Sequence, residues 1–163
     1  MNADRAARAV VERMMATDAF SQWLGVELLD AGVKRAVARM TVRPEMVNGF
    51  GTAHGGIVYS LADSVFAFAT NSNGQISVAV DCSMSYPTAV RPGDVLTATA
   101  VEQSSTRRLG FCEVTIRNQR DEVVGHFRGT IYRTLKPLFA SDETADSQSD
   151  ATSPHPQNTH DSA

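Results

Sequence analysis

Hydrophobic and polar positions along this chain repeat with two periods, one typical of strands and one typical of helices. The clearest strand pattern covers residues 76–86, whose apolar side carries Ile76, Val78, Val80, Cys82, Met84 and Tyr86. Similar alternation predicts strands at 33–43, 94–105, 109–119 and 122–134. The turns between the later strands are Arg91-Pro92-Gly93-Asp94 and Asn118-Gln119-Arg120-Asp121, which are rich in residues that favour turns.

Helical spacing occurs in three places. Residues 4–16 predict one helix, and residues 18–24 predict a second, short helix that ends at Gly25. A long apolar helix is expected from about Gly56 to Asn71, before the stop signal Asn73-Gly74. One long apolar helix among antiparallel strands predicts an α+β domain, in which a sheet of roughly five to six strands wraps around a central helix.

Composition divides the 163 residues into three parts. We expect an N-terminal helical segment at 1–24, a folded domain at 25–136 and a disordered acidic tail at 137–163. Residues 141–163 hold 5 of the 18 acids and no Lys or Arg, and Ala supplies their only apolar surface. Such a segment cannot bury enough apolar area to offset its chain entropy.

Several functional classes are not indicated. The formal net charge is -3, without a basic stripe, so we expect no nucleic acid partner. No apolar stretch reaches the roughly 20 residues of a membrane span, and the first residues lack a signal peptide's apolar core. Cys82 and Cys112 have neither a redox nor a metal spacing, so we expect a cytoplasmic protein with reduced thiols and no metal.

The most informative residue is Asp63, which is the only acid between Glu45 and Asp81, a stretch that also contains no Lys or Arg. A carboxylate in such an apolar segment costs free energy and is often reactive. The small residues predicted to share its helix face are Gly56, Ser60, Ser64, Ala67 and Asn71. A solvated face typically carries long charged side chains, whereas small residues let another backbone or a ligand approach.

His54-Gly55-Gly56 precedes this helix. The first amides of a helix are unpaired and lie at the positive end of its dipole, so they can form an oxyanion hole. The alternative is a simple turn with a structural histidine. Gly56 and Asp63 lie roughly 10 Å apart along one helix. An amide at the start of the helix and the Asp63 carboxylate of the same chain are therefore too far apart to act on one carbonyl. An antiparallel second subunit would bring its own Asp63 across.

These motifs resemble the hotdog-fold acyl-CoA thioesterases, especially the PaaI-type group of phenylacetate degradation. The resemblance rests on Asn48-Gly49, His54-Gly55-Gly56 and Ser60-Leu61-Ala62-Asp63, and on 66–72, 91–94 and 127–129, and it covers about residues 15–135. It implies a hotdog fold, an acyl-CoA substrate whose CoA is no separate cofactor, and a homodimer that forms the active site. Dimers of this group often pair, so we expect a homotetramer.

The resemblance also implies roles for four residues. Asp63 would activate water as general base, which we favour, or attack the thioester itself to give a mixed anhydride. Gly55 would donate its amide to the thioester oxygen, Asn48 would place the water or the carbonyl, and His54 would hold the loop. Some relatives have Ser or Thr near the water on the next strand, where this chain has Ala79.

Further residues are candidates for substrate binding. Gly56, Ser64 and Thr70 lie on or near the helix face of Asp63, and Ser64 or Thr70 could replace the missing hydroxyl. Arg91, Arg107 and Arg108 are expected at turns or strand ends, where they could meet the CoA phosphates, although such arginines are also common on solvated surfaces.

The resemblance implies hydrolysis of a small aromatic acyl-CoA, such as phenylacetyl-CoA or a ring-hydroxylated form. Two alternatives stay open: a non-catalytic acyl-CoA binding or sensor module, and an enoyl-CoA hydratase of the same fold. Hydratases pair Asp and His at a different spacing, and a sensor usually carries an effector domain and tolerates loss of the acid.

Overall fold

The computed structural model describes residues 2–139 of the chain. Its helices are α1 (Ala3–Thr17), α2 (Ala19–Leu24), the short 3-10 helix η1 (Pro44–Met46) and α3 (Gly55–Asn71). Its strands are β1 (Glu27–Gly32), β2 (Arg35–Thr41), β3 (Gln75–Ser85), β4 (Val95–Ser105), β5 (Leu109–Arg117) and β6 (Val123–Pro137). Within residues 2–139, no helix is long and apolar enough to cross a bilayer.

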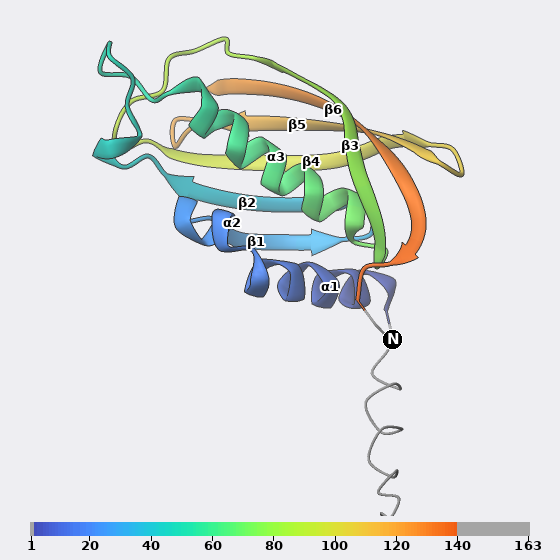
Figure 1. Ribbon diagram of the computed structural model, residues 1–163. Coiled ribbons are helices and arrows are strands. Elements are labelled where there is room, and N and C mark those ends of the chain that lie inside the picture. Colours follow the sequence, from blue (N-terminus) through green and yellow to red (C-terminus); the bar gives the residue numbers. More distant parts are fainter. Residues whose placement is uncertain (1, 140–163) are drawn as a thin grey trace, which may run out of the picture.

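The strands form one antiparallel sheet in the order β1-β2-β4-β5-β6-β3. Helix α3 crosses one face of this sheet, and α1 packs beside β1 at one end (Figure 1). The α+β architecture with a long helix against a wrapped antiparallel sheet is therefore confirmed. β3 has β6 as its strand neighbour on one side, and its other edge pairs with no strand among residues 2–139.

The core lies between α3 and the sheet. β2 and β4 present alanines inward, and these small side chains let the helix approach the sheet closely. The large helix side chains Leu61, Val65, Phe66 and Phe68 are almost fully buried in this space. β6 contributes Gly129, where an added Cβ would lie 2.5 Å from the Phe66 ring, so a larger residue there would push the helix away.

Helix α2 packs against α3 through small polar residues. Asp18 caps α2, since its carboxylate accepts a hydrogen bond from the Ser21 amide at 3.0 Å. The buried Ser21 hydroxyl donates to Asp18 Oδ2 at 2.6 Å, and its oxygen is hydrogen-bonded to the Ser64 hydroxyl of α3 at 2.8 Å. Gly25 ends the helix with φ 80, a conformation that favours glycine. Small residues on α3 thus admit the backbone of α2 of the same chain.

The predicted apolar face of residues 76–86 is confirmed for Cys82 and Met84 but wrong for Val78 and Val80, because β3 contains a bulge between Ala79 and Asp81. The extra residue reverses which side chains face inward. Beyond the bulge, Cys82 and Met84 pack against the core, whereas Val78 is 45% and Val80 is 59% exposed.

Other predictions of strands and helices are close to the observed bounds, but β1 was missed. Its sequence Glu-Leu-Leu-Asp-Ala-Gly lacks clean alternation, and its register with β2 is interrupted between Leu28 and Asp30. At the other end, β6 continues to Pro137, so the first residue of the predicted 137–163 tail is part of the sheet. Residues 140–163 lie outside the described residues, and the division into 1–24, 25–136 and a tail stays a prediction.

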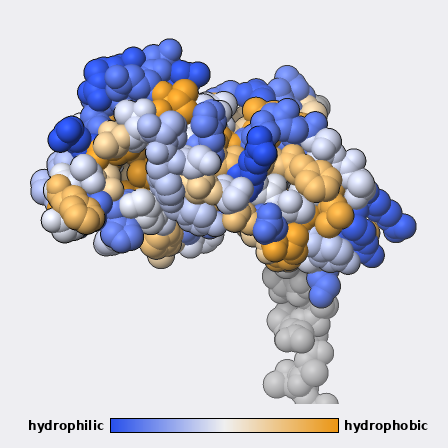
Figure 2. All heavy atoms as spheres, turned by 90° about the horizontal axis from the view of Figure 1, so that it is seen from above, coloured by the Kyte–Doolittle hydropathy of each residue, from blue (hydrophilic) through white to orange (hydrophobic). Residues whose placement is uncertain are grey.

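Several large hydrophobic side chains remain exposed in the single chain. Phe50 is 92% exposed at the tip of the loop before α3, and Phe20 and Trp23 of α2 are 53% and 57% exposed. On the face seen in Figure 2, hydrophobic groups form separate patches between hydrophilic ones. Single exposed hydrophobic residues are ordinary, whereas a contiguous exposed patch marks a ligand or partner contact.

Candidate active site at the start of helix α3

The amide of Gly55, at the start of α3, is available to a ligand. His54 is the N-cap residue, and its Nδ1 accepts a hydrogen bond from the Gly56 amide at 2.9 Å. Among residues 2–139, no group accepts a hydrogen bond from the Gly55 amide. Because this N–H lies at the positive end of the helix dipole, it can stabilise a developing oxyanion. The histidine cap also means that the Gly56 amide is not available to a substrate.

The loop before α3 is held by hydrogen bonds on both sides. The Ala53 amide donates to Val90 O and the His54 amide donates to Met46 O, both at 2.8 Å. Asn48 Oδ1 accepts from the Phe50 amide at 2.9 Å, and its Nδ2 donates to Thr52 Oγ1 at 3.0 Å. In this structure the Asn48 side chain therefore orders the loop that leads to Gly55.

Tyr86 is a site residue that the sequence analysis did not identify. Its hydroxyl donates to Gly55 O at 3.2 Å, and a Cβ on Gly55 would lie 3.5 Å from the nearest ring carbon. The sequence showed Tyr86 only as the last apolar residue of a strand pattern. Its position beside Gly55 depends on the bulge in β3 and on the long connection from β3 to β4, which strand periodicity does not reveal.

Asp63 follows Gly55 by eight residues on α3, so the two groups lie about 12 Å apart along one helix. Within residues 2–139, no hydrogen-bond or ion-pair partner meets the Asp63 side chain. Asp63 is exposed in the single chain, but neighbouring groups partly shield its carboxyl group from water. This desolvation raises the pKa of Asp63. An unpaired carboxylate with a raised pKa is a suitable general base.

Tyr59 lies one turn before Asp63 and faces β3. Burial, reinforced by the nearby Cys82 and Asp63, raises the pKa of Tyr59 to about 12. Its ring packs edge-on against Phe127, with centroids 5.4 Å apart. Burial also raises the pKa of the Cys82 thiol. Both groups are therefore neutral near pH 7, and they form the β3 side of the surroundings of Asp63.

Two hollows flank the first turn of α3. One, of about 280 Å³, is lined by Thr52, Ala53, Gly55, Val58, Tyr86, Thr88, Ala89 and Val90. The other, of about 440 Å³, is lined by Phe20, Trp23, Glu45, Met46, Val47, His54, Gly56, Ile57 and Ser60. The free Gly55 amide therefore lies between two hollows, which could hold the acyl group and the CoA chain of a thioester.

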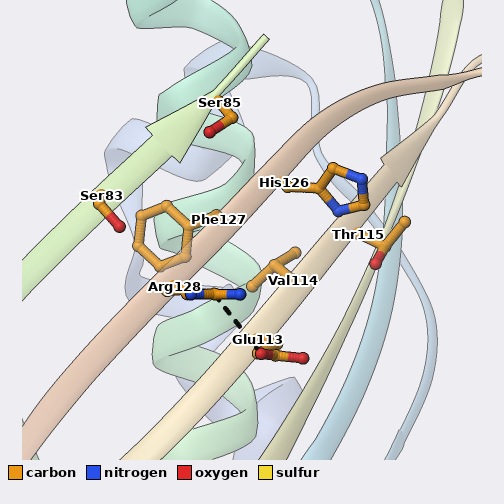
Figure 3. A pocket seen from close by; sticks show the side chains of 8 residues that line it. All are labelled: Ser83, Ser85, Glu113, Val114, Thr115, His126, Phe127 and Arg128. Carbon is orange, nitrogen blue, oxygen red and sulfur yellow. Dashed lines mark ion pairs between the residues drawn. The ribbon is translucent and has the colours of Figure 1, made fainter. Parts of the chain in front are cut away.

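A larger hollow, of about 540 Å³, lies elsewhere. It crosses β3, β6 and β5, with Ser83, Ser85, Glu113, Thr115, His126 and Arg128 among its lining residues (Figure 3). Phe127, between His126 and Arg128 on the strand, contacts Phe66 of α3, so its neighbours point away from the helix. This groove therefore lies on the opposite face of the sheet from Gly55, and its Arg128 pairs with Glu113 at 3.6 Å.

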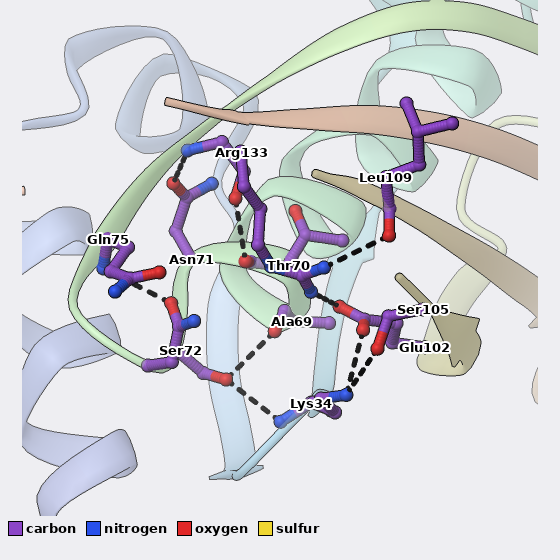
Figure 4. A network of polar contacts seen from close by, with 12 residues as sticks. Lys34, Ala69, Thr70, Asn71, Ser72, Gln75, Glu102, Ser105, Leu109 and Arg133 are labelled. Carbon is purple, nitrogen blue, oxygen red and sulfur yellow. Dashed lines mark hydrogen bonds and ion pairs between the residues drawn. The ribbon is translucent and has the colours of Figure 1, made fainter. Parts of the chain in front are cut away.

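Ser64 and Thr70 are not open to a ligand, which corrects the prediction that they bind substrate. Ser64 is 8% exposed and bonded to Ser21. Thr70 is 2% exposed, and its hydroxyl donates to Phe66 O at 2.8 Å near the far end of α3. Figure 4 shows Thr70 in the polar network around that end, where Arg133 meets Glu102.

The three candidate phosphate-binding arginines do not come together within one chain. Arg91 directly follows Val90, which lines the hollow beside Gly55. Arg107 and Arg108 lie in the turn between β4 and β5, and Arg108 Nη1 donates to Arg133 O at 3.3 Å. This turn is near the C-terminal end of α3, so only Arg91 shares the end of the sheet that holds Gly55.

No group of three or more His, Cys, Asp or Glu side chains suited to a metal occurs among residues 2–139. The chemistry that this part of the chain offers is an unpaired carboxylate, an unpaired helix amide and two adjoining hollows. These are the elements of a hydrolytic site for an acyl group, provided that the carboxylate and the amide come from different subunits.

Comparisons with known proteins identify the family of this chain. Residues 50–124 match the family model described as the thioesterase superfamily. The acyl-coenzyme A thioesterase PaaI of Escherichia coli is 38% identical over 120 residues, which are 74% of this chain and 86% of that protein. The chain therefore belongs to the thioesterase superfamily and is a thioester hydrolase with a hotdog fold, in which the sheet wraps around α3.

Within this superfamily the chain is of the PaaI-like type. The structure of the E. coli PaaI protein from the phenylacetic acid degradation operon has a TM-score of 0.82 with 34% identity, and the match covers 83% of this chain and 99% of that one. A hypothetical thioesterase of Streptococcus pneumoniae, solved with coenzyme A, has a TM-score of 0.66 with 26% identity over 69% of this chain and 90% of that chain.

Proposed function

We propose that this chain hydrolyses a small aromatic acyl-CoA, such as phenylacetyl-CoA or a hydroxyphenylacetyl-CoA, to the free acid and CoA. The observation that carries the proposal is that the Asp63 carboxylate and the Gly55 amide, both on α3, have no hydrogen-bond partner among residues 2–139. The phenylacetic acid degradation operon of the E. coli relative suggests the acyl group. CoA is part of the substrate, and we propose no further cofactor.

In the proposed reaction, Asp63 removes a proton from a water molecule, and the resulting hydroxide attacks the thioester carbon. The negative charge that forms on the carbonyl oxygen is stabilised by the Gly55 amide. The carbon–sulfur bond then breaks, and CoA leaves as the thiolate, which regains a proton. His54 supports this step by capping Gly56, which leaves the Gly55 amide as the free donor. Asn48 acts by holding the loop before α3.

The site requires a homodimer, because Gly55 and Asp63 of one chain are about 12 Å apart on one rigid helix. The unpaired edge of β3 and the exposed Val78 and Val80 favour a twofold partner on this side. A partner whose α3 runs antiparallel brings its Asp63 toward Gly55 of the first chain. We propose that each dimer holds two such sites and that dimers pair into a homotetramer in the cytoplasm.

The CoA phosphates require cations near the site. Arg91 is the first candidate, because it follows the residues that line the hollow beside Gly55. Arg107 and Arg108 can take part only from the partner subunit, since they lie at the other end of α3 in their own chain.

The test is the release of free thiol from a panel of acyl-CoAs, with Asp63→Asn as the variant. Loss of a general base typically lowers the rate by about 10²–10⁴-fold, so we expect Asp63→Asn to lose at least about 10²-fold in turnover while remaining dimeric. Asp121→Asn is the matched control, because Asp121 is an exposed turn residue at φ 63, a conformation that Asn also adopts.

Retained turnover in Asp63→Asn would contradict the role of Asp63. Tight binding of acyl-CoA by the wild type without release of thiol would favour a binding module instead. Loss of absorbance with an enoyl-CoA substrate would favour a hydratase.

A further inference from the structure

The stacked aromatic pair Phe20 and Trp23 lies beside the candidate active site, outside the buried core. The two rings have centroids 6.0 Å apart and an interplanar angle of 23°. Both are more than half exposed, whereas Ser21 and Leu24 of the same short helix are fully buried. Helix α2 therefore packs through one side and presents its aromatic side outward.

The outward side of α2 faces the first turn of α3. Phe20 and Trp23 line the hollow of about 440 Å³ whose opposite wall is formed by His54, Gly56 and Ser60. Figure 1 shows α2 and the start of α3 at the same end of the sheet. His54 and Gly56 flank Gly55 in the sequence, so this hollow begins next to the amide that we assign to the thioester oxygen.

The charges around this hollow exclude the phosphate end of the substrate. Glu45 lines the hollow and would repel phosphates. The nearby Arg43 lies over the Trp23 ring at 5.4 Å, but its guanidinium is held by Glu45 at 2.6 Å and by Leu24 O at 2.9 Å. Met46, Val47 and Ile57 add apolar side chains, and the polar His54 and Ser60 lie on the α3 side. The chemistry suits an uncharged hydrophobic group.

We propose that Phe20 and Trp23 form the wall of the acyl pocket and select an aromatic acyl group by stacking against its ring. This inference rests on the function proposed above, and it adds the residues that determine acyl specificity. Flat rings gain from offset stacking or edge-on contact in addition to the burial of their area. An acetyl group is too small to reach the pair, so its hydrolysis does not depend on it.

The experiment compares kcat/KM for phenylacetyl-CoA and acetyl-CoA in the wild type, in the double variant Phe20→Ala/Trp23→Ala and in Trp23→Leu. We expect the double variant to lose about 10-fold or more with phenylacetyl-CoA and less than about 2-fold with acetyl-CoA. For phenylacetyl-CoA, the kcat/KM of Trp23→Leu, which keeps an apolar surface, should lie between the values of the wild type and the double variant. Leu29→Ala, which shortens another exposed hydrophobic side chain on β1, is the control and should change neither value.

An equal loss with both substrates, or no loss with either, would overturn the pocket assignment. A change in oligomer size of the double variant by light scattering, with equal loss for both substrates, would instead make the pair a contact between subunits. A wild type that cleaves acetyl-CoA but not phenylacetyl-CoA would also refute the inference, while leaving thioester hydrolysis intact. A wild type that cleaves neither would fail the proposed function itself.

Discussion

The two ends of helix α3 differ in how completely their polar groups are paired. At the C-terminal end, Ser72 Oγ donates to Ala69 O and accepts from the Lys34 amide, and Asn71 bonds to Ala67 O and the Ser77 amide. Lys34 also lies 3.1 Å from the buried Glu102. At the N-terminal end, Gly55 keeps a free amide, and Asp63 further along has no partner among residues 2–139.

This difference separates stability from function along one helix. We call the C-terminal end of α3 the closed end and its N-terminal end the open end. Buried charges are tolerated at the closed end because Glu102 is paired with Arg133 and Lys34. Unpaired groups are tolerated at the open end because they remain near solvent, where an unmet hydrogen bond costs little. Substitutions at the closed end should therefore change stability, and those at the open end should change catalysis.

The largest expected effect is at the closed end. Arg133→Ala leaves Glu102 in the core with Lys34 alone and removes the donor to Leu109 O. Breaking a buried pair typically costs about 3–5 kcal/mol, which we expect in the free energy of unfolding measured with urea. Arg128→Ala on the same strand is the control, because its exposed pair with Glu113 should contribute at most about 1 kcal/mol. Equal effects of the two variants would show that the network does not hold the closed end.

The next effect concerns catalysis. Gly55→Pro removes the proposed oxyanion donor, and proline is well tolerated at the first helical position. His54 already has φ -61 and ψ 132, which suits a residue before proline. We expect turnover to fall about 10²–10³-fold with little change in melting temperature. Gly55→Ala, which keeps the amide and whose Cβ fits beside Tyr86, should retain most activity. Similar turnover in the two variants would refute the donor role.

The smallest effect is the pH dependence that follows from Asp63. Desolvation raises the pKa of Asp63, and kcat/KM requires its ionised form. On acidification, the midpoint of the fall in kcat/KM should therefore lie above about 3.9, the ordinary pKa of Asp. The folded state disfavours the ionised form of Asp63. This lowers the free energy of unfolding at any pH above the raised pKa of the folded state, and the penalty vanishes below the pKa of Asp63 in the unfolded chain. Asp63→Asn should thus be at least as stable as the wild type at pH 7. An acid limb at the ordinary pKa, or a less stable variant, would contradict this.

The sequence predicted the helices and most strands because their periodicity is regular. It singled out Asp63 because an acid in an apolar helix is unusual, whereas the role of Gly55 came from the resemblance of His54-Gly55-Gly56 to the thioesterase motif. It failed where one extra residue changes the geometry. The bulge after Ala79 reversed the faces of β3, and nothing in the local pattern marks it. The burial of Ser64 depends on contact with Ser21, 43 residues away, which no local signal reports.

The central claim is that each site combines Gly55 of one subunit with Asp63 of the other. Co-refolding equal amounts of Gly55→Pro and Asp63→Asn chains tests it directly, because half of the resulting dimers contain one site with both native residues. We expect the mixture to regain about a quarter of wild-type activity, although each variant alone is nearly inactive. Activity that stays at the average of the two separate variants, in a mixture shown to contain heterodimers, would contradict it.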